Sequence, residues 1–93
     1  MPTAEDFKHE LFRMMAEAQK AGNEFVEVIA RQLYRSAGGP SGMGNHRMPN
    51  CCQVMWAQVA PDYGDVIVYA PPKKYGPRLT IRYRLPRRER IEL

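Results

Sequence analysis

The chain has 93 residues, enough for one small domain and too few for two independent hydrophobic cores. Hydrophobic residues make up 44% of it, which excludes wholesale disorder, and no apolar run of about 18 residues or basic-then-apolar leader is present, so neither a membrane span nor a signal peptide is expected. The net charge of +4 is unevenly divided: residues 1–30 carry three basic and six acidic side chains, whereas residues 31–93 carry eleven basic and four acidic ones, so the longer segment favours an anionic partner.

The first segment is expected to form an amphipathic helix of about five turns. Thr3 can cap it, and Asp6 three residues later gives a capping-box-like start at the positive end of the helix dipole. Gly22 is expected to end the helix. The apolar residues that share one face are Phe7, Leu11, Met14, Met15 and Ala18.

Two short elements and a loop follow. The β-branched stretch from Glu24 to Ile29 is typical of a strand, and Arg31 to Ala37 is expected to form two helical turns. Arg31 and Arg35 are four residues apart and share one face of that helix. The glycine-rich segment Gly38 to Asn45 excludes regular structure. Because that loop lacks the G-x4-G-K-[ST] spacing, no nucleotide cofactor is expected to bind there.

A third helix is expected to begin near Met48 and Pro49, because proline is favourable at the first helical position, and to run to Val59. Its adjacent cysteines, Cys51 and Cys52, do not make a disulfide framework, so a cytoplasmic location is expected. Neighbouring helical side chains diverge by about 100°, which disfavours joint coordination of one ion. Buried thiols are therefore expected, and no metal.

The C-terminal third changes to a period of two. Val66 to Ala70 is expected to be a strand, residues 71–77 a turn-rich tip, and Arg78 to Leu85 a second strand. In this second strand the inward residues are predicted to be Leu79, Ile81, Tyr83 and Leu85, and the outward ones Arg78, Thr80, Arg82 and Arg84. One domain is thus expected over residues 1–85, followed by a charged tail over residues 86–93.

The order helix, strand, helix, helix, strand, strand predicts an α+β fold that resembles the winged helix-turn-helix domain, in which three helices pack on a small antiparallel sheet. This resemblance implies DNA binding, with the third helix (Pro49 to Val59) in the major groove and the wing hairpin (Val66 to Leu85) on the phosphate backbone. The chain differs from that family in its longer loop before the third helix and in the proline at the start of this helix. The stretch NHRMPNCCQVM also resembles a motif of small uncharacterised bacterial proteins, which implies no activity.

The placement of charge agrees with this resemblance. Cations on the hairpin and on the second helix suit phosphate contacts, and amides on the third helix suit adenine edges. Such binding requires the amides and the strand arginines to lie on one convex surface. The candidate residues for binding double-stranded DNA are Arg31, Arg35, His46, Arg47, Asn50, Gln53, Lys73, Lys74, Arg78, Arg82 and Arg84.

Other functions stay open. The same scaffold can serve as a protein-interaction module of a DNA-processing or restriction-associated complex, which exposed Tyr75, Met43 and Met48 would favour. The acidic first helix can pair with a protein partner or a second copy. A ribonuclease-like reaction centred on His46 is a third interpretation. Because the basic region lacks clustered carboxylates and histidines, a non-catalytic protein is the preferred interpretation.

Overall fold

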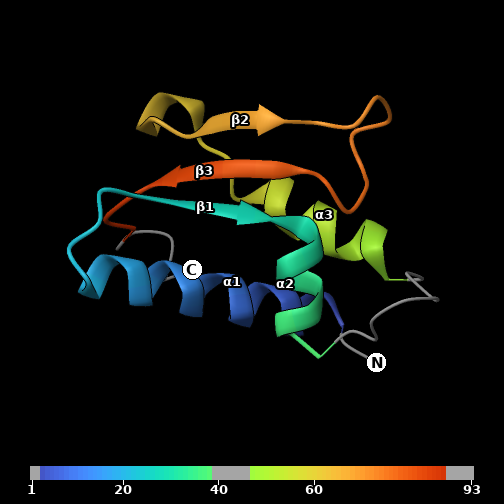
Figure 1. The fold of residues 1–93 in the computed structure, drawn as a ribbon, viewed down its shortest axis with the longest axis horizontal. Helices are drawn as coiled ribbons and strands as arrows, with labels where there is room; N and C mark the ends of the chain where they lie inside the picture. The colour runs from blue at the N-terminus through green and yellow to red at the C-terminus, as the bar shows by residue number, and fades with distance from the viewer. Residues whose placement is uncertain (1–2, 39–46, 88–93) are drawn as a thin grey trace.

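The computed structural model describes residues 3–38 and 47–87, and it arranges them as three helices beside a small antiparallel sheet, an α+β fold (Figure 1). Every expected element is present in the expected order, with ends within two residues of those predicted, and one 3-10 turn is added. None of the helices in these two ranges is both long and apolar enough to cross a bilayer. The elements are α1 (Ala4–Lys20), β1 (Phe25–Ile29), α2 (Ala30–Ser36), α3 (Met48–Ala57), η1 (Pro61–Tyr63), β2 (Val66–Tyr69) and β3 (Thr80–Arg84).

Helix α1 begins with the predicted capping box. The Thr3 amide donates to the Asp6 carboxylate at 2.8 Å, and the Asp6 amide donates to the Thr3 hydroxyl at 3.3 Å. These two bonds satisfy amides that have no partner within the helix. The apolar face of α1 buries Phe7, Leu11 and Met15, while its charged residues lie on the other faces.

The sheet has the order β1-β3-β2, and all of its pairings are antiparallel. Figure 1 shows α1, α2 and α3 on one side of this sheet. The predicted alternation along β3 is confirmed, because Ile81 and Tyr83 are fully buried toward the helices whereas Arg82 and Arg84 are exposed. The opposite face of the sheet, called the outer face below, is therefore left without a covering layer of described residues.

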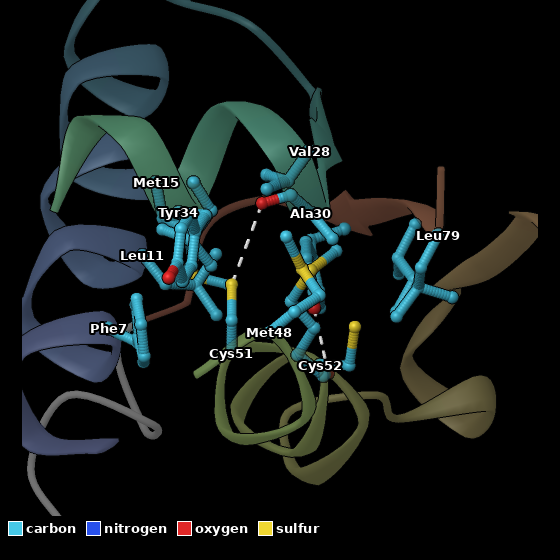
Figure 2. Packing of buried hydrophobic residues seen from close by; sticks show 14 of the residues in the cluster. Phe7, Leu11, Met15, Val28, Ala30, Tyr34, Met48, Cys51, Cys52 and Leu79 are labelled. Atoms are coloured by element: carbon cyan, nitrogen blue, oxygen red, sulfur yellow. Dashed lines mark hydrogen bonds between the residues drawn. The ribbon is translucent and has the colours of Figure 1, made fainter. Parts of the chain in front are cut away.

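Helix α3 forms the centre of the core. Cys51, Cys52 and Met55 are fully buried, and the Tyr83 hydroxyl of β3 donates to the Met55 carbonyl at 2.7 Å. Figure 2 shows the Cys51 sulfur directed at the carbonyl of Ala30, which it contacts at 3.6 Å. The prediction of buried thiols is thus confirmed, and it follows that α3 joins both the other helices and the sheet.

A buried ion pair closes the end of the sheet. Arg87 belongs to the predicted charged tail, and its side chain is fully buried. Its guanidinium forms two hydrogen bonds to the Asp65 carboxylate, at 2.7 and 2.8 Å, and others to the carbonyls of Arg84 and Gln58. It also lies over the Tyr83 ring, 5.0 Å from the centroid. Burial is possible because Asp65 balances the charge and both terminal nitrogens are hydrogen-bonded, while the Nε–H has no partner among the described residues.

Candidate nucleic-acid interface

The loop between β2 and β3 is fastened to α3. The Trp56 indole N–H donates to the Lys74 carbonyl at 2.8 Å, and Cys52 exchanges two hydrogen bonds of 3.4 Å with the backbone of Gly76. Lys74 adopts a left-handed φ of 73°, which is unfavourable for a residue with a side chain. Its amide is held by the Pro71 carbonyl at 2.8 Å. The lysines of the tip therefore occupy a defined position beside α3.

Gln53 is the polar residue of α3 that lies nearest in angle to the tip contact at Trp56. At about 100° per residue, Gln53 lies about 60° around the helix from Trp56, Asn50 about 120° and Arg47 about 180°. Gln53 is exposed and Asn50 is half-buried, while exposed Arg47 stands at the N-terminal end of the helix. The residues Arg47, Asn50, Gln53, Lys73 and Lys74 are named the α3–tip surface here.

The segments that form the α3–tip surface contain no carboxylate. Between Arg47 and Arg87 the sequence has only two acidic residues, Asp62 and Asp65. Asp65 is already paired with Arg87 in the buried ion pair. No acid occurs in α3 or in the tip, and the three cations of the surface form no ion pair among the described residues, whereas Arg13, Arg82 and Arg87 do.

Arg82 and Arg84 do not belong to this surface. They project from the outer face of the sheet, whereas α3 packs beneath the inner face through the bond between Tyr83 and Met55. Arg82 lies 3.8 Å from the Glu27 carboxylate and over the Phe25 ring. The expectation that the strand arginines and the α3 amides share one convex surface is therefore wrong, since the alternation of β3 directs them to opposite sides.

Arg84 has a structural role beside a turn. Gly64 adopts a left-handed φ of 116°, and a Cβ atom built there would lie 2.8 Å from the Arg84 Cδ. The stem of Arg84 thus covers the glycine of the 3-10 turn. Any side chain at position 64 would have to displace it.

Arg31 and Arg78 form a separate pair. Two hydrogen bonds, Ala30 N–H to the Leu79 carbonyl at 2.8 Å and Arg31 N–H to the Pro77 carbonyl at 2.9 Å, join the start of α2 to the segment before β3. Both arginines line one depression on the outer face. Arg35 is exposed one helical turn beyond Arg31, near the end of α2.

The remaining candidate residues belong to the ribonuclease and protein-docking interpretations. His46 and Met43 lie outside the described residues, so neither the ribonuclease interpretation nor the exposure of Met43 has a location in the structure. Met48 is buried, so it lacks the exposure that would favour a protein-docking role. Tyr75, in the tip, is 43% exposed and does favour that role.

Among the described residues, the two cysteines have the setting of buried core thiols. Burial, followed by the neighbouring thiol of Cys52, raises the pKa of Cys51 to about 12. Burial also raises the pKa of Cys52. Within residues 3–38 and 47–87, no three histidine, cysteine or carboxylate side chains come together as metal ligands. Both sulfurs instead contact backbone groups as core residues.

Four of the acidic residues, Glu5, Asp6, Glu10 and Glu17, lie on α1. Arg13 bonds to Glu10 at 2.6 Å and to Glu17 at 2.8 Å, and Glu10 also accepts a hydrogen bond from the Ser36 hydroxyl of α2. Glu10 thus ties α1 to α2. The use of this face by a second copy or another protein stays a prediction.

The hydrogen bonds from Arg13 hold the pKa of Glu10 below its usual 4.5. Because the folded pKa is lower than the unfolded one, the stabilisation by Glu10 is complete above about pH 4.5 and is lost as the pH falls through the folded pKa. Replacing Arg13 by glutamine is expected to raise the pKa of Glu10, as measured by NMR titration of its carboxyl carbon. An identical titration in the variant would contradict this coupling.

Neither a protein family, nor a curated protein, nor a solved structure matches this chain. The class of protein that its geometry supports therefore has to be inferred from the charges and contacts of the molecule.

Proposed function

We propose that the protein is a non-catalytic, cytoplasmic winged-helix protein that binds double-stranded DNA through the α3–tip surface. In this proposal Gln53 and Asn50 meet base edges in the major groove. Arg47, Lys73 and Lys74 hold phosphates on either side. The contact expected from the sequence, with the strand arginines beside the α3 amides, is wrong, and the contact proposed here is a smaller one. Arg31, Arg35, Arg78, Arg82 and Arg84 take no part in it, and His46 lies outside the described residues.

The observation that carries the proposal is the attachment of the hairpin tip to α3 through Trp56 and Lys74. A helix and a cationic tip that keep one relative position can contact a groove and its backbone at the same time. The left-handed backbone of Lys74 supports a functional reason for this geometry, because such conformations persist where the surrounding contacts impose them. The winged-helix assignment has support from the order of elements and from the three-stranded antiparallel sheet.

Titration of a short labelled duplex at increasing salt, followed by fluorescence anisotropy, tests the proposal. With three phosphate contacts, the logarithm of the binding constant is expected to fall with the logarithm of salt at a slope of about −2.7, or roughly 40-fold between about 50 and 200 mM. A protein that shows no binding at low salt, or whose affinity is independent of salt, would refute DNA binding. The exposed ring of Tyr75 would then favour the protein-interaction module.

A further inference from the structure

The outer face of the sheet carries a second candidate site, independent of the α3–tip surface. A depression of about 260 Å³ lies where the end of β1, the start of α2 and the ends of β2 and β3 meet. It is lined by Ile29, Arg31, Tyr69, Arg78 and Thr80. Two arginines and one tyrosine from segments far apart in the sequence thus line it together, and no carboxylate is among the lining residues.

The two arginines are positioned by the fold. The hydrogen bonds from Ala30 and Arg31 to the carbonyls of Leu79 and Pro77 fix both backbones, and the Thr80 hydroxyl donates to the Arg78 carbonyl at 2.9 Å. Neither arginine meets an acidic side chain among the described residues, whereas Arg13, Arg82 and Arg87 all do. Two like charges held together without a carboxylate are suited to an anion, and guanidinium groups bind phosphate oxygens in a bidentate manner.

Tyr69 supplies the other half of the site. It pairs with Thr80 across β2 and β3, and it is 46% exposed on an edge strand whose four residues are all exposed. An exposed aromatic ring beside arginines on a sheet face is the arrangement on which unpaired bases stack. The depression is slightly smaller than the range of about 300–1,000 Å³ typical of small-molecule pockets, which suits one nucleotide rather than a larger ligand.

We infer that this depression binds a single nucleotide unit, with its phosphate between Arg31 and Arg78 and its base against Tyr69. The same chemical unit is present in a free nucleoside monophosphate and at an unpaired 5′-phosphorylated end of a nucleic acid. In either case the bound nucleotide lies on the face of the sheet opposite to the helices, so it does not compete with a duplex on the α3–tip surface.

NMR titration of the 15N-labelled protein with adenosine 5′-monophosphate tests this site. Saturable shifts are expected at the amides of Arg31, Arg78 and Thr80, and adenosine without the phosphate should bind at least about tenfold more weakly, since it lacks the charge-assisted hydrogen bonds. A 5′-phosphorylated single-stranded oligonucleotide forms the second arm. Shifts with the mononucleotide identify a free nucleotide as sufficient, and shifts with the oligonucleotide alone identify a nucleic-acid end. No saturable shift with either probe would overturn the site.

Variants separate this site from the duplex surface. We expect R31Q/R78Q to weaken binding of the effective probe roughly tenfold or more, and the same for Tyr69→Ala. Tyr69→Phe keeps the aromatic ring, so its affinity for the probe should be unchanged. R82Q is the matched control, because Arg82 lies on the same outer face but is paired with Glu27. Far-UV circular dichroism and the unfolding midpoint establish that each variant is folded. An affinity that is unchanged in a folded R31Q/R78Q would refute the inference, and duplex binding is expected to persist in all of these variants.

Discussion

Replacing Arg87 by alanine is expected to lower the free energy of unfolding by about 3–5 kcal/mol, the usual cost of removing one partner of a buried ion pair. The guanidinium has no exposure, and it bonds to Asp65, to the Gln58 carbonyl at the end of α3 and to the Arg84 carbonyl on β3. Its loss leaves the Asp65 carboxylate buried without a counter-charge. Urea unfolding followed by circular dichroism measures the difference.

The matched control is Arg82→Ala. Arg82 also pairs with a carboxylate, but its side chain is 44% exposed and the contact with Glu27 is 3.8 Å long. Exposed pairs of this kind contribute about 0–1 kcal/mol, so this variant should remain close to the wild type. A double-mutant cycle with Asp65→Asn isolates the coupling between the buried partners. If the alanine variants at positions 82 and 87 lose equal stability, the structural role assigned to Arg87 is wrong.

Removing the two lysines of the tip is expected to weaken duplex binding most among the surface changes. Lys73→Gln with Lys74→Gln should reduce the salt slope from about −2.7 to about −0.9, since each lost phosphate contact removes about 0.9. At low salt the affinity should fall at least about tenfold, because a hydrogen bond to a charged group is worth about 1.5–3 kcal/mol. The loss should be the same for every duplex sequence, since phosphate contacts do not discriminate among bases.

Two comparisons sharpen this experiment. Lys8→Gln with Lys20→Gln removes the same charge from α1 and is expected to leave the slope unchanged. Gln53→Ala should keep the slope but reduce discrimination at one base pair by about 1–3 kcal/mol. Equal losses from the two lysine pairs would show that only net charge matters, and the α3–tip surface would then have no special part in binding.

Local patterns along the chain were sufficient to predict most of the fold. The capping box of Thr3 and Asp6, the start of α3 at Met48 and Pro49, and the alternation of β3 depend on neighbours within four residues, and all three are confirmed. The positions of the candidate binding residues on the surface were less predictable. Charge counts located the cations on α2, near α3 and on the hairpin, but they could not distribute these cations among faces.

The division of the basic residues was decided by packing between distant segments. Because α3 lies beneath the inner face of the sheet, Arg82 and Arg84 point away from it, while Trp56 brings Lys74 toward it. The pairing of Arg31 with Arg78 depends on backbone bonds that join residues 30 and 31 to residues 79 and 77. No periodicity within either segment contains this information.

The sequence by itself determined the elements, their buried stripes and the separation of an acidic N-terminal segment from a basic remainder. Only the tertiary structure decided that Arg87 is an interior residue, because burying a guanidinium requires Asp65 and several carbonyls to converge on it from separate elements. It also divided the basic remainder into an α3–tip surface and an outer sheet face. The physical reason is that side-chain periodicity is a local property of each element, whereas the meeting of charges depends on how the elements pack.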